Sequence, residues 1–270
     1  MNLFFESFHV WRDAVIVLII SGVSLSFAGV WLALKKEVFL PLVITSFSSL
    51  GVVAAFFLCE FLGRSFSPYI FSLIFAVGVS FYLANSKYGG INGQIVLYLI
   101  SSSMILIAGS FIRADIHDVS SVLFGSTVLA EPLDIVAVSI ASIVLFAVFA
   151  IFYRKFLFVT TDPQSAKAFG INSYLFNTLL YAVLAIIISV TNKAAGSFPV
   201  LGLTILPAFT GLNFGRKMVT VFIVAGISAA FSSFAGYFIS FRFDLPAGAS
   251  IIAVATIIYC ASVIRKMLSR

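Results

Sequence analysis

The chain has 270 residues, of which 61% are hydrophobic and 10% are charged, and its formal net charge is +6. Soluble globular domains carry charge on roughly a quarter of their residues, so this composition excludes an ordinary soluble domain. The basic residues form no stripe of the kind that nucleic-acid binding requires, so no nucleic-acid partner is expected.

Nine stretches of the chain contain no charged residue, and each is 19 to 25 residues long. An α-helix rises about 1.5 Å per residue, so ~20 residues cross the ~30 Å hydrocarbon core of a bilayer. Backbone polar groups in lipid must be satisfied within the segment, which makes each stretch a helix. In chain order the stretches are Ala14–Leu34, Val38–Cys59, Ser65–Ser86, Tyr88–Ile112, Ile135–Tyr153, Ile171–Asn192, Ala194–Gly215, Met218–Phe241 and Leu245–Ile264. We therefore predict an all-α polytopic membrane protein with one membrane domain over residues 1–270.

The basic residues are distributed unevenly between the two sides of the predicted membrane domain. If the C-terminus is cytoplasmic, the inner side holds 11 of the 16 Lys and Arg residues and the outer side holds 5. Enrichment of Lys and Arg on the cytoplasmic side is the usual bias, so the sequence predicts an outer N-terminus and a cytoplasmic C-terminus. In this topology Cys59 and Cys260 fall near opposite faces, and we do not expect them to pair within one chain.

The outer connection Arg113–Asp134 is one of two that stand out. It holds Asp115, His117 and Asp118, followed by the apolar run 119–130. This run of 12 residues is too short to cross a bilayer, so we expect a short re-entrant or interfacial helix on the outer side. The alternative is a linker that lies on the membrane surface.

The inner connection Arg154–Gly170 carries the signals of a short helix. Asp162 can cap this helix, Pro163 suits its first position, and Gly170 predicts a stop in the left-handed conformation. A helix of about seven residues is not stable alone in water. It must therefore dock, either on its own membrane domain or on a cytoplasmic partner.

The seventh stretch is rich in glycine and proline, including Gly196, Pro199 and Pro207. Proline inside a helix removes a hydrogen bond and clashes with the preceding turn, so we expect this segment to be kinked or broken. Broken helices line the path in many transporters, whereas glycines also allow close helix packing. Both roles stay open at this point, as does the question of whether the segment spans or is re-entrant.

The chain lacks the motifs of common enzymes. No GxxxxGK[ST] loop, no HExxH and no CxxC occurs, and the histidines are His9 and His117. The nine apolar stretches contain no acidic, basic or histidine residue, which argues against an intramembrane enzyme and against a proton-coupled transporter. A transporter of this kind would take its energy from a partner that hydrolyses ATP. A structural membrane protein without transport is a further alternative.

Four blocks along the chain resemble the permease of the metal-ion ABC importer family, the zinc, manganese and iron type. In order they are Leu123–Ser126 with Asp134, Thr161–Gly170, Gly196–Ala208 and Asp244–Gly248. They are similar to the family's outer LFG block, its D-x-x-x-A-x-x-x-G coupling helix, its VGxLLxxALLxxP run and the D-x-P-x-G that opens its last helix. Order and spacing match over residues 15–264.

The resemblance implies the permease subunit of an ATP-binding-cassette importer in a bacterial cytoplasmic (inner) membrane. The implied partners are a second permease copy or a paralogue, cytoplasmic ATPase subunits that use ATP, and an external solute-binding protein. The chain itself would be a transport subunit rather than an enzyme and would bind no cofactor. Its coupling helix, residues 162–170, would rest in a groove of the ATPase through Asp162, Ala166 and Gly170.

The second helix departs from the family pattern. The family commonly carries an Asp and a His four residues apart, before a glycine that matches Gly51. Leu42 and Ser46 stand at those positions here, and neither replaces a carboxylate or an imidazole as a ligand of zinc or manganese. The resemblance implies a divalent metal ion as cargo, zinc or manganese first and iron next. The alternative is a chelated metal or another small solute.

Two groups of residues are candidates for contact with the cargo. The candidates that would line the path are Ser46, Gly51, Gly196, Pro199 and Pro207. Those near the outer face, where a metal ion would enter, are Glu60, Asp115, His117, Asp118 and Asp244, which are otherwise solvated loop charges or helix caps.

Overall fold

The computed structural model describes residues 8–62, 67–86, 90–111, 132–215 and 217–268. Within these ranges nine helices are long and apolar enough to cross a membrane, which confirms the prediction of nine spanning segments. The predicted outer helix at 119–130 lies outside the described residues, as do Asp115, His117 and Asp118.

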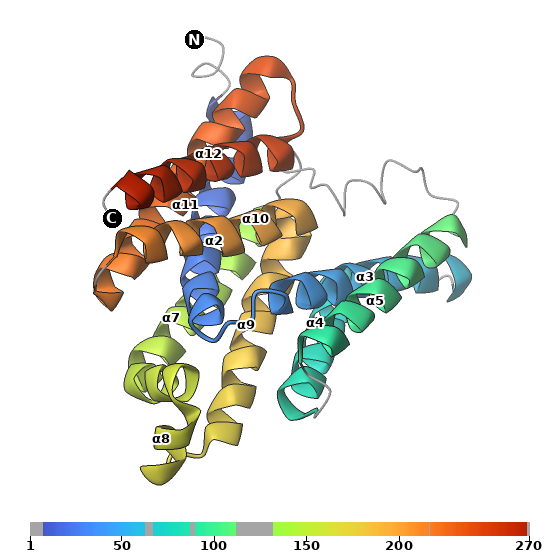
Figure 1. Cartoon of the computed structure of the whole chain (residues 1–270). Helices are drawn as coiled ribbons and strands as arrows, with labels where there is room; N and C mark the ends of the chain where they lie inside the picture. Colours follow the sequence, from blue (N-terminus) through green and yellow to red (C-terminus); the bar gives the residue numbers. More distant parts are fainter. Residues whose placement is uncertain (1–7, 63–66, 87–89, 112–131, 216, 269–270) are drawn as a thin grey trace. The chain divides into compact units, whose positions relative to one another are not determined.

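Figure 1 shows the helices, labelled in chain order. They are α2 (Phe8–Leu34), α3 (Leu40–Leu62), α4 (Pro68–Asn85), α5 (Ile91–Phe111), α7 (Pro132–Thr161), α8 (Pro163–Ala168), α9 (Ser173–Ala195), α10 (Ser197–Phe214), α11 (Met218–Phe243) and α12 (Ala247–Leu268). All except α8 are candidate membrane spans by length and hydropathy.

The chain divides into two compact units. Unit 1 comprises Met1–Ala33, Ser120–Ile140 and Ala194–Arg270, and unit 2 comprises Leu34–Val119 and Ala141–Lys193. Both units are built from segments far apart in the sequence, because α2, α7 and α9 each begin in one unit and end in the other. The expected single domain over residues 1–270 stays a prediction.

In unit 2, α3 packs against both α4 and α5. A Cβ atom on Gly51 of α3 would lie 2.5 Å from the carbonyl oxygen of Phe71 in α4. Gly51 therefore allows the backbones of two helices to approach closely, a common device in membrane helix pairs.

In unit 1, helices α10, α11 and α12 contact one another in pairs. Helix α2 joins this unit through aromatic contacts, since the rings of Phe27 and Trp31 lie 4.6 and 5.6 Å from that of Phe222 in α11. Such ring pairs add to the apolar packing that holds the helices together.

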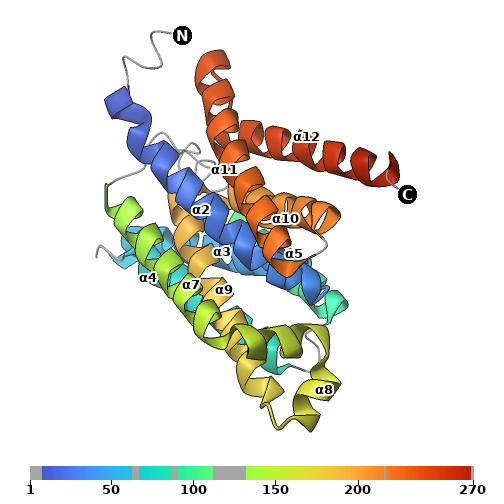
Figure 2. The same ribbon diagram turned by 90° about the vertical axis from the view of Figure 1, so that its left-hand side faces the viewer.

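Helix α7 is longer than the sequence predicts. The apolar stretch ends at Tyr153, but the helix continues through Arg154 and Lys155 to Thr161, with a non-helical residue at Phe152 (φ −106°, ψ 16°). The chain bends there before it reaches α8 (Figure 2). The ammonium group of Lys155 lies over the ring of Phe176, 5.2 Å from its centroid, which keeps the charge compatible with a packed helix.

The expected discontinuity of the seventh segment, 194–215, lies at Gly196, near the start of the segment, and not at a proline. Helix α10 runs from Ser197 to Phe214 with Pro207 inside it, and the discontinuity lies before the helix, at Gly196 with φ 87°. Pro199 lies in the first turn, where the backbone N–H has no partner within the helix, so its ring costs no hydrogen bond. Glycine adopts this positive φ without steric cost, so α9 and α10 are separated at Gly196.

We expect Gly29→Ala to prevent accumulation of the folded protein. A Cβ atom on Gly29 of α2 would overlap the carbonyl oxygen of Thr204 in α10, which is backbone and cannot yield as a side chain can. Overpacking of cores typically costs 1–3 kcal/mol, and a clash with backbone lies at or above the upper end, roughly 3 kcal/mol. The measurement is membrane abundance and thermal stability in detergent. Gly78→Ala is the matched control, because nothing lies within 4 Å of its Cβ position; equal loss in both variants would contradict the packing argument.

Candidate functional site

The predicted coupling helix is formed by α8, and its end has the geometry that the sequence indicates. Gly170 adopts φ +73°, and the N–H of Ile171 donates to the carbonyl oxygen of Ala166 at 3.0 Å. This combination is a Schellman motif, in which a left-handed residue closes the helix and satisfies a free carbonyl. At the other end, the N–H of Ala166 donates to the backbone oxygen of Asp162 at 3.1 Å. The predicted helix start and stop are confirmed.

The residues that α8 exposes are not all those that the family resemblance would place in the groove of the ATPase. Ala166 is fully buried, so it packs against its own chain and cannot face a partner. Asp162, Gln164 and Ala168 are exposed, and Phe169 is 74% exposed, directly after the helix. A partner that docks here would contact this second set of residues. The expectation that Ala166 rests in a partner's groove therefore needs revision.

Aromatic contacts join the end of α7 to the residue that follows α8 and to the start of α9. The ring of Phe169 lies 6.0 Å from that of Phe158 in α7. In turn, the rings of Phe152 and Phe156 in α7 lie 5.6 and 5.9 Å from that of Phe176, in the first turn of α9. The end of α7, the start of α9 and the segment between them lie close together (Figure 2).

A buried cluster of hydroxyl and amide groups joins the helices of unit 2 at the position of the expected path. Ser101 of α5 donates to the hydroxyl of Ser46 in α3 at 2.7 Å. A second set centres on Ser48, whose hydroxyl lies 2.7 Å from that of Ser72 in α4 and accepts a 2.9 Å hydrogen bond from Asn192 in α9. The two sets bring four helices together through neutral polar contacts.

This cluster is a poor site for a bare divalent metal ion. Ser46 is buried and donates its own proton to the carbonyl oxygen of Val43, so its hydroxyl is occupied within the protein. Leu42, one turn earlier, offers no ligand. Neutral hydroxyl groups bind zinc and manganese far more weakly than carboxylates and imidazoles do.

Two of the acidic candidates expected near the outer face are described by the structure, and they belong to different units. Glu60 is exposed in the last turn of α3, in unit 2. Asp244 is exposed and ends α11 in unit 1, with a left-handed φ of 52°. Among the described residues no three His, Cys, Asp or Glu side chains lie close enough to hold a metal ion. Asp244 therefore has an evident structural role as a helix cap.

The remaining path candidates lie in two helices. Ser46 and Gly51 belong to α3, and Gly196, Pro199 and Pro207 belong to α10 or its start. All five are buried. Their contact with a cargo stays a prediction.

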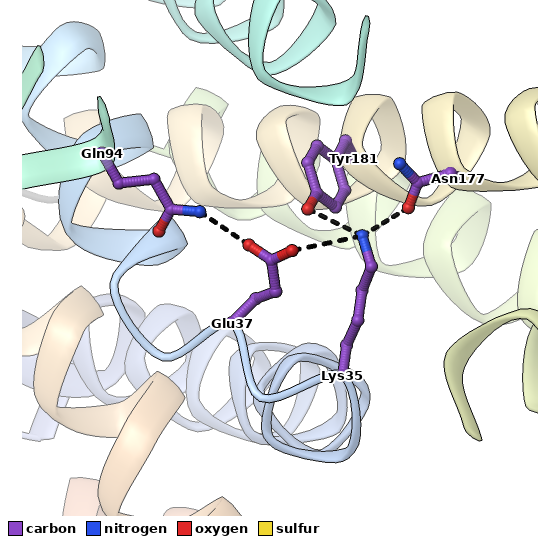
Figure 3. A network of polar contacts seen from close by, with 5 residues as sticks. All are labelled: Lys35, Glu37, Gln94, Asn177 and Tyr181. Atoms are coloured by element: carbon purple, nitrogen blue, oxygen red, sulfur yellow. Dashed lines mark hydrogen bonds and ion pairs between the residues drawn. The ribbon is translucent and has the colours of Figure 1, made fainter. Parts of the chain in front are cut away.

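The sequence reasoning missed a polar cluster around Lys35, directly after α2 (Figure 3). The ammonium group of Lys35 donates hydrogen bonds to Tyr181 and Asn177 of α9 and lies 3.6 Å from the carboxylate of Glu37. Burial lowers the pKa of Lys35 to about 8, and the nearby Glu37 opposes this shift. The sequence analysis counts Lys35 only as one of the basic residues of the inner side and assigns no role to Glu37. The available signal was an acidic residue in a basic connection, with Gln94 near the start of a later helix.

The chain shows a match to a known family over almost its entire length. The model of the ABC 3 transport family matches residues 7–266. Relatives include the manganese import system permease protein ScaB of Streptococcus gordonii, 23% identical over 95% of this chain and 91% of that protein. They also include the high-affinity zinc uptake system membrane protein ZnuB of Haemophilus influenzae, 23% identical over 92% of this chain and 96% of that protein.

A solved structure has the same fold. It is PsaBC from Streptococcus pneumoniae in complex with Fab, of which one chain superposes with a TM-score of 0.82 at 21% identity. The match covers 96% of this chain and 92% of that chain.

Proposed function

This chain belongs to the ABC 3 transport family, and on that premise we propose that it is the membrane-spanning permease subunit of an importer of manganese or zinc ions. It is a multi-pass membrane protein and a transport subunit rather than an enzyme. The observation that carries the proposal is the family match over residues 7–266, on a chain with nine candidate spans in its described residues. Iron is the next cargo in order, since the family resemblance includes it.

The proposed partners follow from the same membership. A second copy of the chain or a paralogue would complete the permease. Cytoplasmic ATPase subunits would bind and hydrolyse ATP, so this chain would need no cofactor. An external solute-binding protein would deliver the cargo. The exposed residues of α8 support a docking role on the cytoplasmic side. This helix of six residues presents Gln164 to solvent and is followed directly by the exposed ring of Phe169, and both are suited to a partner's groove.

A chelated metal or another small solute is the second candidate cargo. The observation that favours it is the neutral cluster around Ser46 and Ser101, which replaces the charged ligands expected for a bare ion. Hydroxyl and amide groups suit a cargo that carries its own ligands.

Reconstitution of the complete importer tests the proposed function. The permease, its ATPase subunit and the binding protein are assembled in lipid vesicles, and ATP hydrolysis and metal uptake are measured together. We expect manganese or zinc, loaded on the binding protein, to stimulate ATP hydrolysis. The metal should accumulate on the side of the vesicle membrane where the ATPase subunits lie. Stimulation by a chelated metal alone would favour the second candidate, and no stimulation by either would contradict an importer.

We expect thiol labelling to place the N-terminus outside and the C-terminus inside. The variants are Ser67→Cys, before α4, and Leu268→Cys, at the end of α12, in a background without Cys59 and Cys260; both chosen positions are exposed. Asn192 would be a poor probe because it is only 2% exposed. An impermeant reagent on intact cells or spheroplasts should modify Ser67→Cys and spare Leu268→Cys, since basic residues are enriched on the cytoplasmic side. The reverse pattern would invert the topology.

A further inference from the structure

Lys35 lies in the connection between α2 and α3 and is held from two sides (Figure 3). Its ammonium group donates to the hydroxyl of Tyr181 at 2.7 Å and to the side-chain oxygen of Asn177. It also lies 3.9 Å from the centroid of the Tyr181 ring, a cation–π distance. Only 16% of the Lys35 side chain is exposed. The charge is therefore largely removed from water and depends on these partners.

Glu37 extends the contact from Lys35 to two further helices. One carboxylate oxygen forms the ion pair with Lys35, and the other accepts a 2.6 Å hydrogen bond from Gln94, which is 3% exposed in the first turn of α5. The backbone oxygen of Glu37 accepts from the N–H of Leu40, the first residue of α3. Lys35 and Glu37 thus connect the start of α9 with the starts of α3 and α5.

The start of α9 follows α8 closely in the chain. Only the connection 169–172 separates α8 from α9, and Phe176 in the first turn of α9 packs against Phe152 and Phe156 of α7. Asn177 follows Phe176 directly, and Tyr181 lies one turn later. A displacement of α8 would therefore act on Asn177 and Tyr181 through the short connection 169–172 and the start of α9, which packs against α7.

We propose that Lys35 is a positioning residue that transmits the movement of α8 to α3, the helix that carries Ser46 and Gly51. The inference rests on the proposed function, in which an ATPase moves α8. The link consists of polar contacts at the predicted inner ends of the helices, where residues 35–39 connect α2 to α3 and belong to neither helix. Loss of the link would leave docking and ATP hydrolysis in place but separate them from transport.

Lys36 provides a matched control. It is the neighbour of Lys35, carries the same charge, and is exposed, so its removal changes the charge of the connection without removing the contacts to α9. The test compares Lys35→Met with Lys36→Met in the complete complex with its ATPase and binding protein. Three quantities are measured: co-purification of the ATPase, the rate of ATP hydrolysis, and metal uptake per ATP hydrolysed.

We expect Lys35→Met to retain ATPase binding and hydrolysis but to lower uptake per ATP by about tenfold, equivalent to roughly 1.4 kcal/mol of coupling free energy. Lys36→Met should stay within about twofold of wild type, a change of roughly 0.4 kcal/mol. Equal uptake per ATP in Lys35→Met and wild type, or an equal loss in both variants, would overturn the inference. A wild-type complex that binds no ATPase or takes up no metal would instead contradict the proposed function.

A double variant on α9 tests the same link independently, in case Lys35→Met does not fold. Asn177→Ala with Tyr181→Phe removes both acceptors on α9 but leaves Lys35 paired with Glu37. If the link transmits movement, this double variant should lose uptake per ATP as Lys35→Met does. Normal uptake per ATP in the double variant would overturn the inference even if Lys35→Met fails to fold.

The dependence of uptake per ATP on pH tests whether the charge of Lys35 transmits movement or whether Lys35 has only a structural role. The groups that face the Lys35 ammonium are Glu37 in the same connection and, from α9, Tyr181 and the neutral Asn177. The pKa of Lys35 lies near 8, so the ammonium group loses its charge, and with it the ion pair to Glu37, as the pH rises through this value. Uptake per ATP in the wild type should fall over this range relative to Lys35→Met, whose ratio is already low. If uptake per ATP changed with pH in the same way in the wild type and in Lys35→Met, the proposed role of the Lys35 charge would be overturned.

Discussion

Gly170→Val is expected to abolish co-purification of the ATPase subunit and metal uptake while the permease keeps its normal abundance in the membrane. Gly170 has φ +73°, a conformation that costs about 1–2 kcal/mol for a residue with a side chain and more for a β-branched one. A Cβ atom at this position meets nothing within 4 Å, so the effect comes from the backbone and not from a clash. The substitution should therefore displace the end of α8 and spare the helices of the membrane domain.

Gly78→Val is the matched control for this prediction. The Cβ position of Gly78 is also open within 4 Å, but its φ is helical. Abundance, thermal stability and ATPase co-purification are measured for both variants after mild detergent extraction. Wild-type assembly and uptake in Gly170→Val would mean that α8 is a surface helix without a docking role. A substitution at Ala166 cannot replace this test, because a larger side chain there would disturb the buried packing of the permease itself.

The purified permease–ATPase complex, without binding protein, is expected to bind neither zinc nor manganese stoichiometrically at sub-micromolar concentration. A divalent ion gives up its hydration shell only where stronger ligands replace it, and these are normally Asp, Glu, His or Cys. Leu42 offers no ligand, and the hydroxyls of Ser46 and Ser101 are hydrogen-bonded to each other. Isothermal titration with each metal measures the affinity.

A gain-of-function variant sharpens the metal-binding prediction. Leu42→Asp with Ser46→His places a carboxylate and an imidazole one helical turn apart on α3, the pair that the family commonly carries. We expect this variant to bind zinc measurably more tightly than the wild type. Sub-micromolar binding by the wild type that survives removal of His117 and of the outer-face acids Glu60, Asp115, Asp118 and Asp244 would show that the ligands lie elsewhere in the chain.

If this chain binds metal ions only weakly, the selectivity of the importer for its cargo must come from another subunit or from the cargo itself. Either the external binding protein selects the ion and the permease provides a weakly binding path, or a paralogous partner supplies the missing ligands. A third reading is that the cargo is not a bare ion. The titration distinguishes these cases when it is repeated with the complete complex, because only a ligand-bearing partner would then add a tight site.

The helices and the ends of α8 could be predicted from the sequence because their causes are local. Lipid leaves a backbone no partner except its own helix, so uncharged stretches of about 20 residues identify the spans. The stop at Gly170 follows from the conformational freedom of one residue. The extension of α7 past Arg154 and Lys155 could not be predicted in this way, since Lys155 there contacts the ring of Phe176, which lies in another helix.

The sequence by itself determined that this is a polytopic helical membrane protein, where its spans lie, and which family it resembles, since hydropathy, helix signals and motif spacing are properties of short segments. Only the tertiary structure decided which side of α8 is exposed, that Ser46 pairs with Ser101, and that Lys35 contacts Asn177 and Tyr181, more than 140 residues away in the chain. The physical reason is that burial and hydrogen bonding depend on which helices pack together. In a membrane, where nearly every helix surface is apolar, hydropathy alone does not specify those neighbours.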